Sequence, residues 1–500
     1  MSLLNVKKRI FFTSIFVMLV TILPYGNNMI ATPTLSPTAA VFENDVDPLV
    51  DLQITIDFFY IRGLEVDFNQ YPPDFFLKLW LNGILFESPI WEVTNQVYNP
   101  WTVSYDIPDT NDTVSILIEL WNNQDGSPVL CDLSGTPNSG SIGYSLALLY
   151  NVKTGHWDGD DRIGDASGYG RANGCDDGSI YSFESDCELG FMIYCNDYDG
   201  DGIPYWMEVY DYGTDPMIDN RGEDADSDSA PIEWEFLWEY DPFLGDNHSV
   251  LDDDNDSLSN IEEFYTMSFS SDPFRRDLFL EMDYMDVGPN GAQSIVPEES
   301  RELLKDPFHR RNIVFHFDTG ELNGGELVPF EPLISIDEVI PLYNQYFLHN
   351  DSTTWRRGVF HYGIYVYSTK PNGYGFSGDV EPFMGYLPGT NSFIISSKQM
   401  EINALWKGNS LEYYYAAATM HEMGHTMGIR NGHPPGCDVF LSKWPWQPGW
   451  WIYRTYKSIM NYEYTYRIFD YSDGSHGVQD FDDWSNLNLS HFEIPENYVP

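Results

Sequence analysis

A pattern of acidic residues repeats three times in the middle of the chain and restricts what this segment can fold into. Each copy has aspartates at positions 1, 3 and 5 of a twelve-residue stretch and a glutamate at position 12, and the copies follow one another at intervals of 27 and 28 residues. This is the ligand order of a calcium-binding loop. Without cations so many neighbouring carboxylates would repel one another strongly. The sequence therefore predicts about three structural Ca²⁺ ions within residues 196–273. The predicted calcium ligands are Asp197, Asp199, Asp201, Glu208, Asp224, Asp226, Asp228, Glu235, Asp252, Asp254, Asp256 and Glu263.

These units resemble EF-hand-like loops in the short calcium repeats of thrombospondin-type and dockerin-like modules. Gly202 stands at position 6 of the first loop, where the backbone turns, but Ser229 and Ser257 stand there in the second and third. Because the Cβ of serine opposes such a turn, we expect the second and third sites to be weaker.

The acidity extends over the whole 500-residue chain, whose formal net charge is −52. That charge argues against nucleic acid or anionic membrane as a partner, because both bind through Lys and Arg. Hydrophobic residues make up 42% of the chain, enough for packed cores. The length suggests about two to four domains.

The first residues have the pattern of a secretion signal. Lys7, Lys8 and Arg9 precede an apolar run over 10–23. The run is short of the roughly 20 residues that span a bilayer. We expect a signal peptide at 1–31, a linker at 32–44, and a secreted protein with no stable membrane span once the signal is removed. The alternative is an uncleaved N-terminal anchor with the protein facing outside.

Residues 45–195 show short strands joined by turns. Apolar or alternating runs at 52–56, 75–81 and 114–120 are separated by clusters of Asn, Asp, Gly and Pro. This spacing predicts an antiparallel β-sandwich. Its acidic loops loosely resemble those of C2-type calcium-binding sandwiches.

The chain has five cysteines, and none shows the paired short spacing of a structural zinc site. Four of them lie in the predicted sandwich. Four cysteines could form two disulfides, and three pairings are possible. Cys437 is left over. The four are Cys131, Cys175, Cys187 and Cys195.

Residues 274–490 show a mixed α/β pattern, followed by a short tail at 491–500. We expect strands at 277–284, 313–317, 359–366 and 392–396, and helices at 297–306 and 336–347. The predicted fold class is multidomain: an N-terminal antiparallel β-sandwich, small calcium-loop repeats and a C-terminal α/β domain.

A further helix is expected at 411–427. Asn409 is its expected N-cap, and Glu412, three residues on, completes a capping box. Within it, His421 and His425 are four residues apart, so their imidazoles share one face and can reach one metal ion. Glu422 lies one position round the helix, where it suits a general base acting on water.

This part of the chain resembles the metzincin family of zinc peptidases, whose signature continues through a glycine and which have a Met-turn downstream. Gly428 stands at the required place, and residues 458–462 (Ser-Ile-Met-Asn-Tyr) match the Met-turn. The resemblance implies a metzincin-like catalytic domain with one catalytic Zn²⁺ held by His421, His425 and a third ligand. It implies that Met460 lies beneath the metal and that Tyr462 stabilises the transition-state oxyanion.

The third ligand departs from the family pattern, because the residue three positions after the glycine is Asn431, a poor zinc ligand. We expect His433, two residues later, to replace it. Asp438 is the second candidate, since some relatives use Asp. Asn431 itself, Cys437 and water remain as further alternatives.

The resemblance implies a secreted zinc-dependent endopeptidase that hydrolyses a protein or peptide substrate and is stabilised by calcium. The main alternative is a catalytically inactive, calcium-dependent extracellular binding or surface protein. A zinc hydrolase with another substrate is a third, because zinc chemistry alone does not name the substrate. The sequence leaves the oligomeric state undetermined.

Overall fold

The computed structural model describes residues 45–65, 68, 71–136, 143–160, 170–180, 184–351, 353–369, 392–429 and 432–489. These residues belong to one compact unit, Asn44–Pro500. The predicted signal peptide (1–31), linker (32–44) and tail (491–500) lie outside the described residues. Within the described part, no helix combines the length and the apolar character that crossing a bilayer requires.

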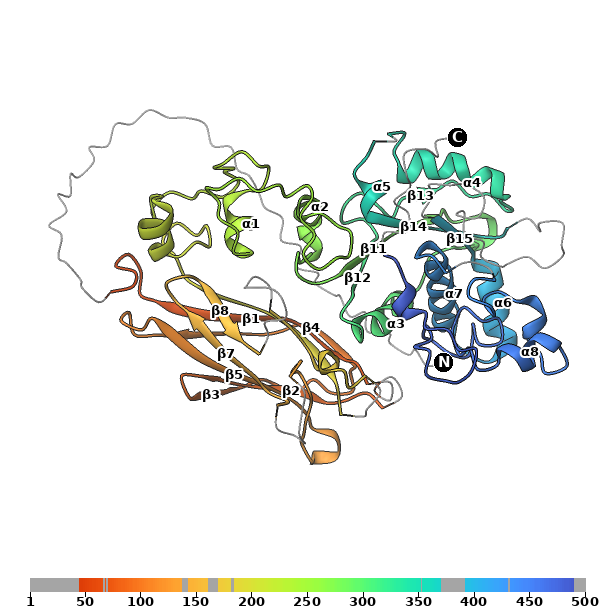
Figure 1. Ribbon diagram of the computed structural model, residues 1–500, viewed down its shortest axis with the longest axis horizontal. Coiled ribbons are helices and arrows are strands. Elements are labelled where there is room, and N and C mark those ends of the chain that lie inside the picture. Colours follow the sequence, from red (N-terminus) through yellow and green to blue (C-terminus); the bar gives the residue numbers. More distant parts are fainter. Residues whose placement is uncertain are drawn as a thin grey trace, which may run out of the picture. The chain divides into compact units, whose positions relative to one another are not determined.

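The predicted antiparallel β-sandwich is confirmed (Figure 1). One sheet has the strand order β4-β1-β10-β9, and the other has the order β3-β2-β5-β7-β8 with β6 beside β5. In β2 every second residue is buried, as expected where one face of a strand meets a core and the other meets solvent. The strands are β1 (Gln53–Gly63), β2 (Phe75–Leu81), β3 (Ile84–Glu87), β4 (Gln96–Asp106), β5 (Thr113–Asn122), β6 (Val129–Leu130), β7 (Leu146–Asn151), β8 (His156–Gly159), β9 (Gly170–Asn173) and β10 (Cys187–Cys195).

The cysteines of the sandwich do not form the two disulfides that their number suggested. All five cysteines of the chain are described, and all five are free thiols. Cys131 and Cys187 are fully buried, and the Cys187 thiol donates to the Ser185 carbonyl at 3.4 Å. They serve as small apolar residues of the core, a frequent use of free cysteine.

The repeat segment contains only short helices and two small apolar clusters. One cluster holds Ile203, Ile232 and Phe236, and the other holds Trp234 and Trp238 with their neighbours. Cores of this size bury little apolar surface, so other interactions must order the segment. The helices are η4 (Met207–Tyr212), α1 (Ile232–Leu237), α2 (Asn260–Tyr265) and η5 (Met267–Phe269).

A parallel sheet of order β12-β11-β14-β15 organises the rest of the chain, with β13 also paired to β11 (Figure 1). Its strands are β11 (Asp277–Met285), β12 (Val314–Asp318), β13 (Leu327–Val328), β14 (Phe360–Val366) and β15 (Ser392–Ser396). Leu278, Leu280 and Met282 of β11 pack with residues of α3 (Glu298–His309) and α7 (Leu411–Thr426), whereas Phe279 packs with η7 (Tyr343–Phe347) on the other face. The four strands expected from the sequence are therefore present, with limits shifted by one residue at most.

Helices cover both faces of this sheet. They are α3 (Glu298–His309), α4 (Ile336–Leu342), η7 (Tyr343–Phe347), α5 (Arg356–Val359), α6 (Ser397–Lys407), α7 (Leu411–Thr426) and α8 (Pro448–Tyr453). The cap of α7 differs from the prediction: Ser410, not Asn409, precedes the helix, and its hydroxyl accepts a hydrogen bond from the Tyr413 N–H. Asn409 instead donates its amide to the Tyr466 carbonyl.

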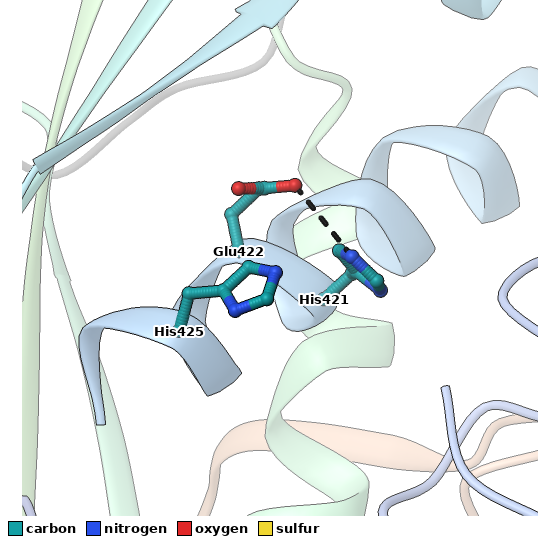
Figure 2. Close-up of side chains that lie close together, drawn as sticks. All are labelled: His421, Glu422 and His425. Carbon is teal, nitrogen blue, oxygen red and sulfur yellow. Dashed lines mark ion pairs between the residues drawn. The ribbon is translucent and has the colours of Figure 1, made fainter. Parts of the chain in front are cut away.

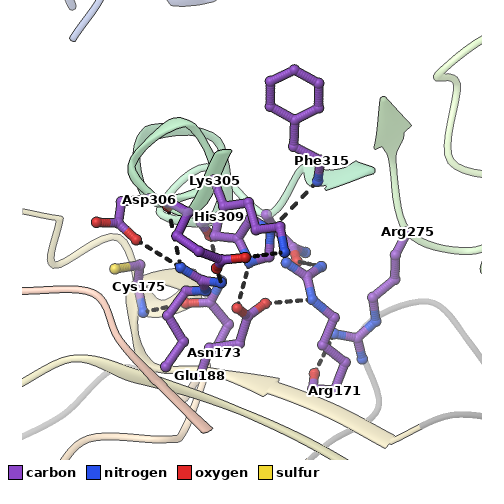
Figure 3. A network of polar contacts seen from close by, with 12 residues as sticks. Arg171, Asn173, Cys175, Glu188, Arg275, Lys305, Asp306, His309 and Phe315 are labelled. Atoms are coloured by element: carbon purple, nitrogen blue, oxygen red, sulfur yellow. Dashed lines mark hydrogen bonds and ion pairs between the residues drawn. The ribbon is translucent and has the colours of Figure 1, made fainter. Parts of the chain in front are cut away.

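Buried polar contacts join the sandwich to α3 (Figure 3). Helix α3 in turn packs with α7. Glu188 of β10 accepts hydrogen bonds from Arg171 and from His309 of α3, both at 2.5 Å. Burial raises the pKa of Glu188, but Arg171 and His309 outweigh it and hold that pKa well below its usual range. Arg62 of β1 donates to Asp306 of α3 at 3.0 Å. The sandwich therefore helps to fix the helix behind α7.

Candidate metal centres

Helix α7 presents its two histidines in fixed orientations. The His421 Nδ1–H donates to the Ile459 carbonyl at 2.9 Å, and the His425 Nδ1–H donates to the Ile429 carbonyl at 2.6 Å. Because each Nδ1 carries its proton toward a backbone oxygen, each Nε2 is left to act as a ligand. Figure 2 shows the two imidazoles and the Glu422 carboxylate gathered on this part of the helix.

The carboxylate of Asp438 lies beside both of these Nε2 atoms. Its Oδ1 is 3.1 Å from His421 Nε2 and its Oδ2 is 2.9 Å from His425 Nε2. Its side chain is 6% exposed. Burial raises the pKa of Asp438, but the imidazoles of His421 and His425 outweigh it and hold the pKa well below its usual range. The carboxylate is therefore ionised and directed at the histidine pair.

The predicted Met-turn, residues 458–462, positions both His421 and Asp438. The Ile459 carbonyl orients His421, and the next carbonyl, of Met460, accepts the Asp438 N–H at 3.1 Å. Met460 packs directly against the helix: a Cβ added at Gly424 would lie only 2.5 Å from the Met460 sulfur. A side chain at position 424 would therefore force the side chains of Met460 and Tyr471 to move.

The third-ligand prediction needs a correction, because Asp438 and not His433 lies beside the two imidazoles. The His433 side chain is exposed. Asn431 lies outside the described residues. Cys437 is buried close to His425 and Asp438, and burial raises the pKa of its thiol, which keeps it protonated. The order of the two main candidates is therefore the reverse of the expected one.

The physical reason is the path of the loop. Gly428, Gly432, Gly436 and Asp438 all have positive φ, and the last has a φ of 53°. With these left-handed residues the chain returns to helix α7 at Asp438, further along the sequence than the third ligand of the family pattern. A sequence signal for this path exists only in the three glycines, which mark turns without saying where the chain returns.

The two remaining predicted catalytic residues border the cluster. Glu422 is buried, and its Oε1 lies 3.9 Å from His421 Nε2. The ring of Tyr462 stacks on that of His421, with 6.0 Å between centroids and 21° between planes. Tyr462 is half-buried. Both side chains are thus within reach of a molecule bound at the histidine pair.

The donor set fits a zinc ion. Catalytic zinc is commonly held by two histidines and one carboxylate, with a further position open. Ligand atoms bound at about 2.0–2.1 Å in a tetrahedron lie roughly 3.3 Å apart. The distances of 3.1 and 2.9 Å between Asp438 and the imidazoles are close to this spacing.

The three acidic repeats share one backbone arrangement. At position 5 the aspartate accepts the N–H of position 7 with one oxygen, at distances of 2.9, 3.0 and 2.7 Å in the successive loops. With its other oxygen it accepts a later backbone N–H, which belongs to Asn220, Asp246 and Asp277 in turn. The third of these residues is the first residue of β11, so the third loop is closed by the parallel sheet.

Position 6 has the conformation expected of a calcium loop in all three copies. Gly202 has a φ of 93°, Ser229 of 86° and Ser257 of 79°. The two serines therefore adopt a backbone region that costs an L-residue about 1–2 kcal/mol. Such strain persists where the surrounding structure demands it.

The glutamates at position 12 are buried among the aspartates of their own loops. Burial, followed by repulsion from Asp201, raises the pKa of Glu208 to about 8. Burial raises the pKa of Glu235 to about 7, although the nearby imidazole of His248 acts to lower it. Burial and the charge of Asp256 also raise the pKa of Glu263. All twelve predicted ligands are described, and each loop brings its own carboxylates together.

Sequence reasoning missed a histidine at the second loop. His248 is buried, and its Nε2 lies 3.2 Å from Asp228 Oδ2 and 3.6 Å from Glu235 Oε1. On the other side its Nδ1 meets the Asn260 amide at 3.1 Å. His248 lies between two repeats, outside the twelve-residue ligand pattern. The sequence therefore gave no sign that it contacts the second loop.

No protein-family model matches the chain, and no curated protein matches it in sequence. Solved structures that are similar to it include a C2 domain at 10% identity, with a TM-score of 0.18, covering 28% of this chain and 97% of that one. A C2 domain of plant extended synaptotagmin 1 matches at 9% identity and a TM-score of 0.18, over 29% of this chain and 94% of that one. Human GIVD cytosolic phospholipase A2 matches at 12% identity and a TM-score of 0.18, over 28% of this chain and 17% of that one.

Proposed function

We propose that the protein is a secreted, zinc-dependent endopeptidase whose fold is stabilised by calcium. The observation that carries the proposal is the meeting of His421, His425 and Asp438 beside Glu422. Each imidazole has its Nδ1–H tied to a backbone carbonyl and its Nε2 directed at one carboxylate. The peptide substrate is inferred from the resemblance of this segment to metzincins.

His421, His425 and Asp438 would hold the zinc ion. When bound there, zinc lowers the pKa of a water molecule toward neutrality and polarises a carbonyl group. Glu422, buried and one helix position from His421, takes the proton from the attacking water and passes it to the leaving amine. Burial keeps bulk water from competing for that proton.

Two further residues support this chemistry. The Tyr462 hydroxyl donates a hydrogen bond to the oxygen of the scissile carbonyl as negative charge develops on it. Met460 takes no part in the reaction. It supports the helix at Gly424 and holds Asp438 through its backbone carbonyl.

The three acidic repeats serve as structural calcium sites in this proposal. Their twelve carboxylates are grouped four to a loop, and their loop turns match the calcium-loop pattern at positions 5 and 6. Calcium would neutralise acids that otherwise repel one another in a segment with little apolar core.

The test is casein or gelatin hydrolysis by the purified mature chain in calcium and zinc, beside Glu422→Ala, with all bound transition metals counted in both. We expect the wild type to cleave, and the variant to keep one zinc and lose roughly 10²–10⁴-fold in rate. Glu412→Ala, in the half-buried first turn of the same helix, is the matched control and should cleave normally.

The outcomes separate the alternatives. If folded wild type holds no zinc and cleaves nothing, the endopeptidase proposal fails, and a calcium-dependent binding or surface protein becomes the better account. Zinc bound with hydrolysis of a non-peptide ester and no proteolysis would support a zinc hydrolase of another substrate class.

A further inference from the structure

A group of buried acids lies on the face of the parallel sheet opposite to α7. Glu281 and Asp283 are on β11 and Asp318 ends β12, and all three have an exposed fraction of 0%. Glu281 is paired in register with Asp318 on one side and with Tyr362 on the other. Odd-numbered side chains of β11 point away from the α7 face, because successive side chains alternate along a strand. The group is therefore separate from the histidine pair.

Part of this acidity is compensated. Arg356 donates to Glu281 Oε2 through Nε at 3.0 Å and to Asp318 Oδ2 through Nη2 at 2.6 Å. Asp318 also accepts the backbone N–H groups of Gly320, Leu322 and Gly324, each at 3.1 Å. Asp318 and one oxygen of Glu281 therefore have all the partners that they need.

The rest of the acidity is not compensated. Glu281 Oε1 and Glu326 Oε2 are buried atoms with no hydrogen-bond partner among the described residues. Asp283 accepts from two neutral donors, the Tyr362 hydroxyl at 2.7 Å and the Glu326 N–H at 2.8 Å. Within the described part of the chain, four carboxylates thus share the guanidinium of Arg356, and an unpaired carboxylate is costly to bury.

The surrounding loop is folded tightly over these acids and opens at one side. A Cβ at Gly324 would lie 2.7 Å from Asp318 Cγ and 2.9 Å from Glu281 Cγ. The Glu326 side chain is 31% exposed, and its Oε1 lies 3.4 Å from His349 Nδ1. Glu326 therefore forms the solvent-facing edge of this acidic group.

Burial and mutual repulsion leave these carboxyls short of positive charge. Burial raises the pKa of Asp283 to about 7, and Glu326 adds to the effect. Burial also raises the pKa of Glu281 even with Arg356 beside it. A bound cation removes this penalty, and so does a proton shared between Asp283 and Glu326. The two explanations differ in whether a metal is present.

We propose that Glu281, Asp283 and Glu326 bind a calcium ion at a fourth site, distinct from the three acidic repeats and from the histidine pair. The free donors are all carboxylate oxygens, which suit a hard cation and not zinc. Calcium coordination is flexible enough to combine oxygens of the buried Glu281 and Asp283, an oxygen of the partly exposed Glu326, and water. The proposal does not depend on peptidase activity.

The test is native mass spectrometry of the mature chain, equilibrated with calcium as the only added divalent metal, comparing wild type with Glu326→Gln. We expect Glu326→Gln to hold one calcium fewer than wild type. Glu321→Gln removes an exposed acid from the same loop and should keep the wild-type number. Glu208→Gln, in the first repeat, should also lose calcium, and its combination with Glu326→Gln should show both losses.

Asp283→Asn is the second variant, since it keeps a hydrogen-bond acceptor for Tyr362. If circular dichroism shows that Glu326→Gln does not fold, Asp283→Asn tests the site in its place. One calcium fewer in a folded variant supports the site. The wild-type calcium number in folded Glu326→Gln or Asp283→Asn overturns the proposal and assigns the shared proton instead.

Discussion

The histidine centre and the acidic repeats are both candidate metal sites, but their charges are arranged in opposite ways. At the histidine centre one ionised carboxylate lies beside two imidazoles, so the site holds a single acidic ligand. In the repeats carboxylates face carboxylates, and their pKa values are raised. The repeats therefore hold more unbalanced negative charge than the histidine centre, and we expect them to depend more strongly on a bound ion. From this difference we expect that removing calcium would affect the folding of this molecule more than removing zinc would.

The largest expected effect follows from removing calcium. An ion present at 100 times its Kd stabilises the folded state by roughly 2.7 kcal/mol, so three such sites contribute roughly 8 kcal/mol. We expect EGTA to expose residues 196–273 to hydrogen exchange, while a zinc-selective chelator leaves this segment protected and stops hydrolysis. Equal protection of residues 196–273 from hydrogen exchange with and without EGTA would show that calcium does not stabilise this segment. The contrast drawn between the two kinds of site would then be wrong.

The next effect separates the candidate third ligands. Asp438→Ala should weaken zinc binding by more than about 100-fold, since even outer-shell partners of a metal site contribute 10–100-fold. His433→Ala should change zinc affinity and hydrolysis less than about twofold, because its side chain is exposed. Competition with a zinc chelator measures both affinities. The reverse result would restore His433 as the ligand.

Tyr462→Phe tests a residue that touches the centre without holding the metal. Removing one hydrogen-bond donor to a developing oxyanion costs roughly 10²–10³-fold in kcat. We expect a fall of about 10²-fold in kcat with an unchanged zinc content. Loss of zinc in this variant would indicate a role in metal binding instead.

The pH dependence of the calcium-free chain should follow the raised pKa values. Glu208 and Glu235 have folded-state pKa values of about 8 and 7, above the unfolded value of about 4.3. The folded state then binds more protons than the unfolded state over this range, so stability falls as pH rises toward 8. In EGTA we expect the unfolding temperature to rise by a few degrees from pH 8 to pH 5.5. With calcium bound, acid should lower it, because protons displace the ion.

The smallest effect concerns the turn at position 6. Ser229→Gly relieves a left-handed serine and should stabilise the calcium-bound chain by about 1 kcal/mol. Gly202→Ala in the first loop should destabilise it by a similar amount. Calcium-dependent thermal unfolding measures both, and an unchanged Ser229→Gly would show that the serine turn carries no strain.

Local patterns were sufficient to predict much of this molecule. The period of apolar residues located the strands of the parallel sheet and helix α7, and the spacing of aspartates located the loops. In contrast, Asp438 lies thirteen residues beyond His425, and a loop with several left-handed residues, Gly436 and Asp438 among them, returns it to the helix. The pairing of Arg62 with Asp306 joins residues 244 positions apart. Contacts of this kind depend on the tertiary path, which no short window of sequence contains.

The closing of the third loop by Asp277 has a consequence for the order in which the chain is made. The amides that close the first two loops, at Asn220 and Asp246, lie within the repeats and are available as soon as the repeats are synthesised. The third amide belongs to β11 and emerges only afterwards. A nascent chain that ends at Pro273 would therefore carry all twelve predicted calcium ligands and still be unable to complete its last loop.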